Sequence, residues 1–93
     1  MIKSFADKET RKVYQREFSK HFPADIQQSA LRKLRMLNND QPVQDLRSPP
    51  GNRLEKLKGE REGQYSIRIN DQWRVCFAWH ESDAYQVEIT DDH

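Results

Sequence analysis

The sequence contains a single cysteine, Cys76, and this scarcity excludes an internal disulfide and any metal site built from several cysteines. It lacks an apolar run near the roughly 20 residues of a membrane helix, and its start, MIKSFADKETRK, has no apolar signal-peptide core. The three histidines are scattered at positions 21, 80 and 93 and do not suggest a metal site. We therefore expect a cytoplasmic protein of a reducing compartment, without a metal or another cofactor.

Apolar residues are also scarce, at 34% of the 93 residues. A chain of this length buries roughly 60–65% of the surface that its unfolded form exposes. The apolar residues are nonetheless strongly patterned and the net charge is only +1, which argues against disorder. We expect residues 1–93 to form one small domain with a thin core.

The small net charge hides an uneven distribution. Residues 81–93 contain five of the 15 acidic residues and none of the 16 Lys and Arg. Ordinary surface solubility accounts for this composition. The more specific alternative is a basic surface for phosphate groups, with an acidic segment at its border.

The first helix is predicted between Asp7, which can cap it, and about Ser19. Tyr14 and Phe18 are four residues apart and would lie on one side of this helix. The short alternating run at residues 2–5 is expected to form an edge strand.

A second helix is predicted to start at Pro23 or Ala24 and to end at the Asn38-Asn39 pair. Lys and Arg at positions 32, 33 and 35 lie off its apolar side and are expected to face solvent. The apolar stripe consists of Ile26, Ala30, Leu31, Leu34 and Leu37. The two helices should form a hairpin on one face of a sheet.

The cluster RSPPGN at residues 47–52 breaks regular structure. Before it, apolar residues recur with the spacing of a helix, and after it they recur at every second residue, as in a strand. Residues 54–63 give a short strand and a polar loop. Residues 64–69, 73–80 and 84–90 alternate between apolar and polar, separated by short polar turns. This pattern predicts an antiparallel meander with one face on the helices and one polar face, an α+β fold.

The alternation also fixes how the second and third of these runs pair, because both must present their apolar residues to the same core. A turn over residues 70–72 satisfies this condition, whereas a two-residue Asn-Asp turn mixes the faces. The longer turn pairs Ile67 with Val75 and places Arg68 directly opposite Arg74, on the polar face. We call these two residues the arginine pair.

Like charges directly opposite each other destabilise a sheet, so the arginine pair suggests a bound anion or a nearby carboxylate. Together with Lys58 or Arg61 it would make a phosphate site. The alternative is a polar sheet face that Glu88 and Asp92 neutralise. Cys76 shares this face and is best explained as a small filler.

The same parity argument at the next turn pairs Trp79 with Tyr85 and places Arg74 beside Thr90. The C-terminus then returns to the arginine pair and brings His93 to that end of the sheet. A histidine there can exchange protons near neutral pH. Strand alternation, however, points His93 towards the core side, and a frayed, inert terminus is the default expectation.

The stretch LRSPPGNRLEKLKGEREGQYSIRINDQWRVCFAW, with VEITDDH near the end, closely resembles the HigB toxins of the RelE/ParE superfamily of type II toxin–antitoxin systems. The resemblance implies two helices against a small, strongly curved, mainly antiparallel sheet. It also implies ribosome-dependent, metal-independent cleavage of mRNA, in which a ribose 2′-OH attacks the adjacent phosphate. The implied partner is a HigA-type helix-turn-helix antitoxin, and operator DNA is bound only through the toxin–antitoxin complex.

The chemistry that the resemblance implies needs cations around the phosphate and a proton-transfer group. Arg68, Arg74 and Lys58 would stabilise the negative charge that develops in the reaction. His93 is the candidate general base or acid, oriented by Asp91.

Further residues are expected to hold RNA. Arg53, Lys56 and Arg61 would bind the backbone of mRNA or ribosomal RNA. Asp92 stands where many relatives carry an aromatic residue that can stack on a base. Glu55 stands where some carry a histidine, which makes it a second candidate for the base.

Two other functions remain open at this point. A ParE-like toxin blocks a protein target such as DNA gyrase without catalysis and needs neither His93 nor Lys58. A non-toxic binding module would do no more than occupy an antitoxin.

Overall fold

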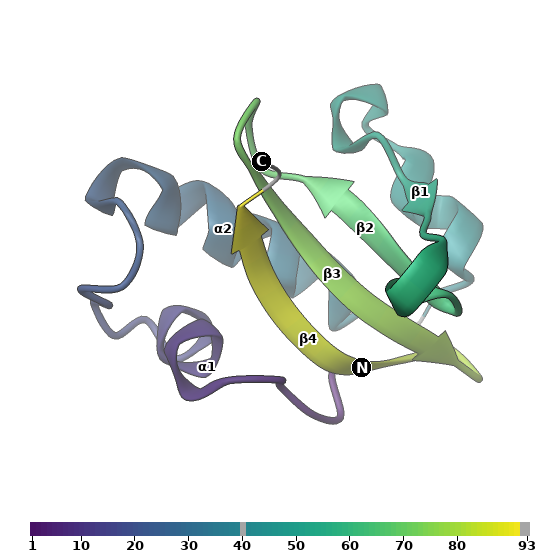
Figure 1. The fold of residues 1–93 in the computed structure, drawn as a ribbon, viewed down its shortest axis with the longest axis horizontal. Coiled ribbons are helices and arrows are strands. Elements are labelled where there is room, and N and C mark those ends of the chain that lie inside the picture. Colours follow the sequence, from purple (N-terminus) through teal and green to yellow (C-terminus); the bar gives the residue numbers. More distant parts are fainter. Residues whose placement is uncertain (40, 92–93) are drawn as a thin grey trace.

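A computed structural model describes residues 1–39 and 41–91 of the chain. Figure 1 shows two helices beside a curved sheet. The helices are α1 (Lys8–Tyr14) and α2 (Ala24–Leu37), and the strands are β1 (Glu55–Lys56), β2 (Gln64–Arg68), β3 (Trp73–His80) and β4 (Asp83–Asp91). Three short 3₁₀ turns, η1 (Val43–Arg47), η2 (Pro50–Asn52) and η3 (Gly59–Arg61), lie between α2 and β2.

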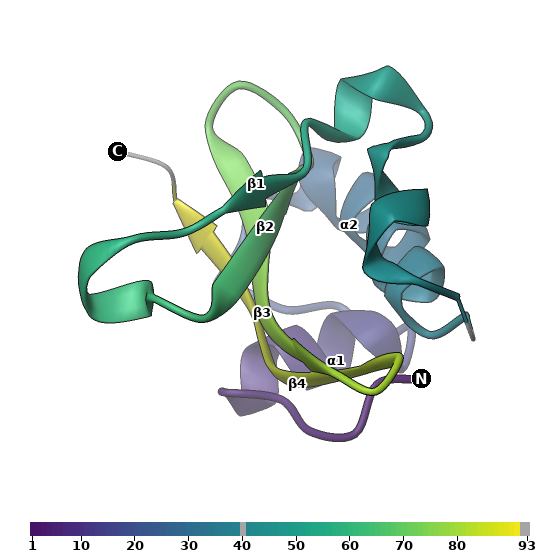
Figure 2. The same cartoon turned by 90° about the vertical axis from the view of Figure 1, so that its right-hand side faces the viewer.

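The four strands form one antiparallel sheet in the order β1-β2-β3-β4, which confirms the predicted meander and the α+β class. Figure 2 shows α2 and the chain that follows it on one side of the sheet, and the loop around η3 on the other. The predicted two-layer arrangement, with a helical hairpin on one face, is therefore confirmed.

The core lies between the helices and the sheet. On α2 the predicted stripe is buried except for Leu31, which is half-buried. The hydroxyl of Thr10 on α1 accepts a hydrogen bond from the Ile89 backbone N–H of β4 at 3.0 Å and so joins the two layers. The buried apolar residues are Val13, Phe22, Ile26, Ala30, Leu34, Leu37, Leu46, Ile67, Val75, Phe77, Ala84, Val87 and Ile89.

The β2–β3 hairpin has the predicted register. Arg68 is opposite Arg74, and Ile67 is opposite Val75. Between the strands, the side-chain oxygen of Asn70 accepts hydrogen bonds from the backbone N–H groups of residues 72 and 73, at 2.9 and 2.8 Å. An Asn side chain in this role mimics a backbone turn, which explains why the hairpin takes the longer connection.

The β3–β4 register agrees with the prediction at one end and differs at the other. Arg74 is opposite Thr90, as expected. Further along the strands the register shifts, so Trp79 is opposite Ala84. The predicted pairing of Trp79 with Tyr85 is wrong, and Ala84 is fully buried where Tyr85 was expected on the core side.

The cause of this shift is the turn between the strands. It has only two residues, Glu81 and Ser82, whose φ angles of 50° and 68° are both left-handed, as in a type I′ turn. A bulge then restores the apolar alternation, and Gln86 within it has a φ of 53°. Val87 and Ile89 return to the core side as a result.

The N-terminal residues lie along the outer edge of β4, as expected of an edge strand, but residues 2–5 form isolated bridges and no strand. They pair in parallel through two isolated bridges, Ile2 with Ala84 and Phe5 with Val87. The bulge at Gln86 lies between the two bridges and interrupts a continuous ladder.

Helix α1 is shorter than predicted, ending at Tyr14 instead of near Ser19. Its start is as expected, since the Asp7 carboxylate accepts a hydrogen bond from the Thr10 N–H at 2.6 Å. Phe18 is 65% exposed, so the predicted Tyr14–Phe18 contact along one helix face is wrong.

The early end of α1 comes from a Schellman motif. The N–H of Glu17 binds the carbonyl of Lys12 at 2.8 Å, and the N–H of Arg16 binds the carbonyl of Val13 at 3.1 Å. Arg16 occupies the position that glycine usually takes and has a φ of 64°. A non-glycine residue in the left-handed region costs roughly 1 kcal/mol or more. The end of α1 therefore places the backbone of Arg16 under strain.

Replacing Arg16 with glycine should relieve this strain. We expect Arg16→Gly to raise the free energy of unfolding by roughly 1 kcal/mol, measured by urea denaturation. Arg11→Gly, inside the same helix, should lower it by roughly 1 kcal/mol. Destabilisation by both substitutions would contradict the strain at Arg16.

Candidate active site

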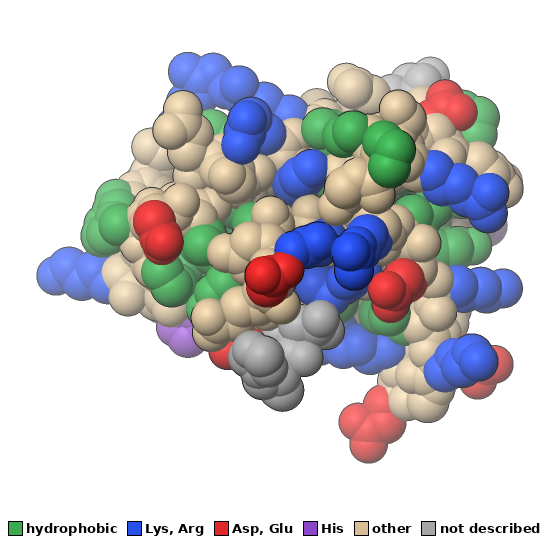
Figure 3. All heavy atoms as spheres, turned by 90° about the horizontal axis from the view of Figure 1, so that it is seen from above, with side chains coloured by type: hydrophobic (Ala, Val, Ile, Leu, Met, Phe, Trp, Pro, Cys, Tyr) green, Lys and Arg blue, Asp and Glu red, His purple; other side chains and the backbone are tan. Residues whose placement is uncertain are grey.

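A hollow of about 250 Å³ opens on the sheet face that points away from the helices. Figure 3 shows Lys and Arg side chains gathered near the middle of the molecule in this view, with acidic side chains beside them. The lining residues come from all four strands and from the loop after β1: Glu55, Leu57, Arg61, Ser66, Arg74, Cys76, Thr90 and Asp91.

Arg74 is the best-fixed cation of this hollow. It is only 8% exposed, and its Nε donates to the Ser66 hydroxyl at 2.8 Å. One terminal nitrogen donates to the backbone carbonyl of Arg53 at 2.9 Å and lies 3.8 Å from the Glu55 carboxylate. The guanidinium is therefore held in one orientation before any ligand arrives, with an exposed carboxylate as its weak counter-ion.

Arg68, directly opposite, is held much less firmly. Its side chain is 24% exposed and pairs with Asp71, which is 95% exposed in the turn that follows β2. An ion pair so close to solvent contributes at most about 1 kcal/mol. The like-charge repulsion of the arginine pair is thus relieved by a separate acidic residue on each side.

Arg61 lies at the border of the hollow and pairs with Glu88 of β4 at 2.7 Å. It also donates to the Gln64 side-chain oxygen at 3.1 Å. The hydrogen bond to Glu88 raises the pKa of Arg61. The predicted neutralisation of the polar face by Glu88 is therefore found, but it acts on Arg61 and leaves the arginine pair to other acids.

Asn52 fixes the backbone that holds Arg74. It is fully buried, and its amide nitrogen donates to the carbonyls of Leu46 and Ser48 at 3.1 and 3.4 Å. Its amide oxygen accepts a hydrogen bond from the Lys33 ammonium of α2. Arg53 follows in a left-handed conformation, with a φ of 46°, and presents its carbonyl to Arg74.

The charged Lys33 side chain binds Asn52, and its partial burial costs desolvation energy. Burial lowers the pKa of Lys33, and the neighbouring Arg32 lowers it further. The Asn52 oxygen compensates in part by accepting a hydrogen bond from the ammonium. Helix α2 is thereby linked to the polar sheet face through the residues around η2.

The structure brings some of the other predicted residues to the hollow. Asp91 lines it and accepts a hydrogen bond from the Gln72 side chain at 3.0 Å. Lys58 is exposed, immediately after the lining residue Leu57. Asp92 and His93 lie outside the described residues, and their predicted roles remain predictions.

Two residues predicted to bind RNA are placed differently from the lining residues. Lys56 is opposite Tyr65, whereas its neighbour Glu55 is opposite Ser66 in the hollow. Strand alternation therefore turns Lys56 to the other face of the sheet. The Arg53 side chain is exposed, and its backbone carbonyl is the part that contacts Arg74.

Sequence reasoning missed three supports of the site. Ser66 could have been found, because the predicted register places it opposite Cys76 on the arginine face. Asp71 was explained only as a turn residue, yet it is also the counter-ion of Arg68. Asn52 gave no signal beyond its place in a breaker cluster, since its partners are backbone groups of a non-repetitive segment.

Within residues 1–39 and 41–91, no group of three or more His, Cys, Asp or Glu is arranged to hold a metal ion. No helix in these ranges is long and apolar enough to cross a membrane. The side chains that line the hollow supply cations, hydroxyls, carboxylates and one thiol.

Comparisons with known proteins identify similar toxins. Residues 3–93 match a family model described as the RelE-like toxin HigB of type II toxin–antitoxin systems. The chain is 41% identical over 81 residues to toxin HigB-1 of Vibrio cholerae serotype O1, covering 85% of this chain and 84% of the relative. It is 29% identical to endoribonuclease HigB of Proteus vulgaris over the full length of both.

Solved structures share the fold at low sequence identity. The crystal structure of YafQ from E. coli superposes with a TM-score of 0.60 at 13% identity, covering 99% of this chain and 92% of YafQ. A chain of the YoeB–YefM complex from Staphylococcus aureus superposes with a TM-score of 0.58 at 16% identity, covering 100% and 95%. Both likenesses support a RelE-like architecture.

The unequal support of the arginine pair predicts unequal effects on stability. Arg74→Gln should lower the free energy of unfolding by about 1.5–3 kcal/mol, because buried acceptors lose a charged donor. Arg68→Gln should change it by less than about 0.5 kcal/mol, since its pair is near solvent. Urea denaturation of both variants tests this difference, and equal losses would contradict it.

Proposed function

The chain belongs to the HigB-like family, the RelE-like toxins of type II toxin–antitoxin systems, and we propose that it is an endoribonuclease that cuts mRNA on the ribosome. The observation that carries this proposal is the arginine pair, with Arg74 already hydrogen-bonded in place at a hollow of about 250 Å³. The relative named endoribonuclease HigB supports the same activity.

The reaction we propose is a transesterification. The ribose 2′-oxygen attacks the adjacent phosphorus, and the bond from phosphorus to the 5′-oxygen of the next nucleotide breaks. The products are a 2′,3′-cyclic phosphate and a free 5′-hydroxyl. A base removes the proton of the 2′-OH, and an acid supplies one to the leaving 5′-oxygen, so no water or metal enters this step.

Negative charge builds up on the phosphoryl oxygens as the 2′-oxygen attacks. Arg74 supplies a cation whose orientation is fixed in advance, which is the arrangement that stabilises a transition state most effectively. Arg68 would leave the exposed Asp71 and bind the same phosphate from the opposite strand. Lys58 adds a third cation from the loop beside Leu57.

His93 is our candidate for the base or acid, with Asp91 orienting it from the end of β4. Asp91 lines the hollow and lies two residues before His93 in the chain. Glu55 is the second candidate, because its carboxylate lines the hollow 3.8 Å from Arg74. In the proposed reaction, this carboxylate would accept the 2′-OH proton.

The surroundings of the hollow would hold the RNA. Arg61 lines the hollow and is 42% exposed despite its pair with Glu88, and the exposed Arg53 would bind the RNA backbone nearby. Asp92 would contact the substrate near the C-terminus. Lys56 lies on the other face of the sheet. It would therefore bind RNA only if the RNA passed around the edge of the sheet.

The ribosome is proposed to complete the site by fixing the mRNA conformation for in-line attack. The chain alone provides cations for the phosphate. Orientation of the substrate supplies a large part of catalysis in such reactions, and the ribosome would supply that orientation. As a type II toxin the protein has an antitoxin partner. We propose that this partner is of the HigA type and carries a helix-turn-helix domain, and that the toxin acts in the cytoplasm.

Loss of a phosphate-binding cation should slow cleavage strongly. Arg68→Gln, Arg74→Gln and Lys58→Met should each reduce the cleavage rate on programmed ribosomes by about 10²–10³-fold. Primer extension on the mRNA measures the new 5′ ends. Lys20→Met serves as the control, because Lys20 is exposed between α1 and α2 and does not line the hollow. Wild-type cleavage in all three variants would contradict the proposal.

The base can be identified by pH dependence. His93→Gln should abolish most cleavage and remove the limb of the pH–rate profile near neutral pH that a histidine gives. Glu55→Gln should keep that limb. If Glu55→Gln abolished cleavage and His93→Gln left the rate and the limb unchanged, Glu55 would be the better candidate for the base. If His93→Gln remained fully toxic and inhibited DNA supercoiling by gyrase, the toxin would instead act without RNA cleavage.

A further inference from the structure

The loop between β1 and β2, residues 58–63, lies on the side of the sheet away from α2 (Figure 2). Its residues are exposed except Arg61, which is half-buried. Gly59 and Gly63, on either side of Arg61, have φ angles of 68° and 91°, which glycine adopts at little cost. The side chain of Arg61 is therefore the part of this loop that is packed against the sheet.

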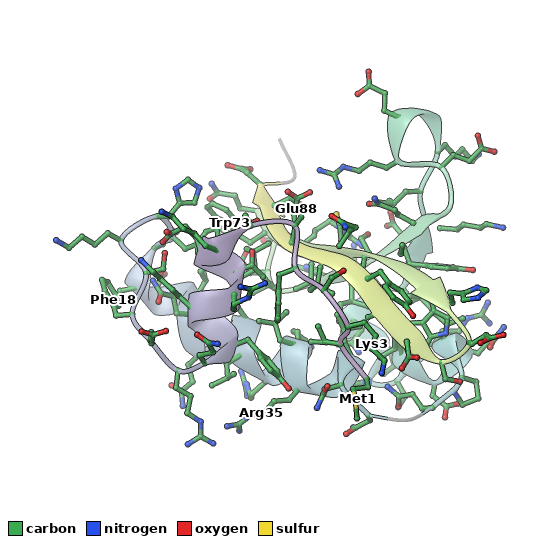
Figure 4. All side chains as sticks on the ribbon, turned by 90° about the horizontal axis from the view of Figure 1, so that it is seen from below. Met1, Lys3, Phe18, Arg35, Trp73 and Glu88 are labelled. Carbon is green, nitrogen blue, oxygen red and sulfur yellow. The ribbon has the colours of Figure 1, made fainter. Side chains whose placement is uncertain are left out.

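Arg61 reaches from this loop to β4, which is at the other end of the strand order from β1. A terminal nitrogen of Arg61 donates a hydrogen bond to the Glu88 carboxylate of β4 at 2.7 Å. Figure 4 shows Glu88 on the side of the sheet away from α2. Glu88 is opposite Cys76, which lines the hollow of the candidate active site. This ion pair, which we call the Arg61–Glu88 clasp, thus crosses the polar face at the border of that hollow.

Arg61 and both members of the arginine pair have an acidic partner, and in the clasp this acid is the least exposed of the three. The Glu88 side chain is 27% exposed, against 59% for Glu55 and 95% for Asp71. Glu55 is 3.8 Å from its arginine, whereas the clasp is a direct hydrogen bond. Hydrogen bonds between two charged groups at such a short distance are about twice as strong as neutral ones. Glu88 therefore competes more strongly than Glu55 with a phosphate.

A free RNA strand that reaches the hollow meets cations that are already paired with carboxylates. A phosphate binds Arg61 only by displacing Glu88, and the released carboxylate then repels the RNA backbone. Because Arg61 is 42% exposed, this competition is modest and lowers the affinity by about three- to tenfold. RNA that a larger body holds at the hollow has a high effective concentration there, and it overcomes the same competition.

We propose that Glu88 is a specificity-determining residue, which withholds Arg61 from free RNA and releases it to RNA that the ribosome holds at the hollow. This inference rests on the proposed function and deepens it, because it names a residue that separates two kinds of substrate. In a purely structural role the clasp would instead fix the loop that carries Lys58, and its loss would slow cleavage. The two roles therefore predict opposite effects of removing the Glu88 charge.

The test is fluorescence anisotropy of toxin variants with a labelled single RNA strand whose 2′-O-methyl riboses block cleavage. Glutamine has the shape of glutamate without its charge, so Glu88→Gln should bind this strand about three- to tenfold more tightly than wild type. The released Arg61 adds one phosphate contact. The slope of log affinity against log salt should therefore become steeper by about 0.7.

Two controls separate the clasp from general charge. Glu17→Gln removes the same charge from an exposed residue that follows α1 and does not line the hollow, and it should bind the strand within about twofold of wild type. In an Arg61→Gln background, Glu88→Gln should also change the affinity by less than about twofold, because the arginine that Glu88 withholds is absent. Urea denaturation confirms that each variant is folded.

Cleavage kinetics on programmed ribosomes give a second reading. Glu88→Gln should lower KM and should not lower kcat, because the clasp is already open when the phosphate is bound. A folded Glu88→Gln variant that binds free RNA like wild type would overturn the proposal. So would a lower kcat at unchanged KM, which is the result expected of a structural clasp. Wild-type toxin that does not cleave mRNA on ribosomes would overturn the proposed function, while the anisotropy measurement still decides whether Glu88 withholds Arg61.

Discussion

The pairing of β2 with β3 is the constraint on which the site depends. Both strands must send their apolar residues to one thin core, and the turn over residues 70–72 is the connection that allows this. The same parity places Arg68 and Arg74 side by side on the other face. A shift of one residue would mix the faces and turn one of the two arginines toward the core, so the arrangement that folds the protein is also the one that creates a phosphate-binding surface.

The two arginines then differ in what surrounds them. Arg74 is buried and bound to Ser66 and to the Arg53 carbonyl, which Asn52 and Lys33 anchor to α2. Among residues 1–39 and 41–91, the acidic partner of Arg68 is the exposed turn residue Asp71. One cation is thus preorganised, and the other is free to exchange an acidic partner for a ligand. The fixed cation of Arg74 and the movable cation of Arg68 together suit a reaction in which negative charge grows on one phosphate.

The sequence was sufficient to predict elements in which the spacing of apolar residues is regular and ends at clear turn or cap residues. It predicted α2, the meander and the arginine pair, because these follow from alternation and parity. It failed where backbone conformation decided the outcome. A left-handed Arg16 ended α1 early, and a two-residue turn with a compensating bulge moved Trp79 from Tyr85 to Ala84. The anchor at Asn52 could not be predicted, since it binds carbonyls that no side-chain pattern reveals.

In the proposed reaction, Arg68 and Arg74 act on one phosphate. A double-mutant cycle on cleavage by programmed ribosomes tests it most directly, using Arg68→Gln, Arg74→Gln and the combined variant. Groups that act as a unit are non-additive, so we expect a coupling of about 0.5–3 kcal/mol and a double variant little slower than the worse single one. Effects that add within about 0.5 kcal/mol would contradict a shared phosphate.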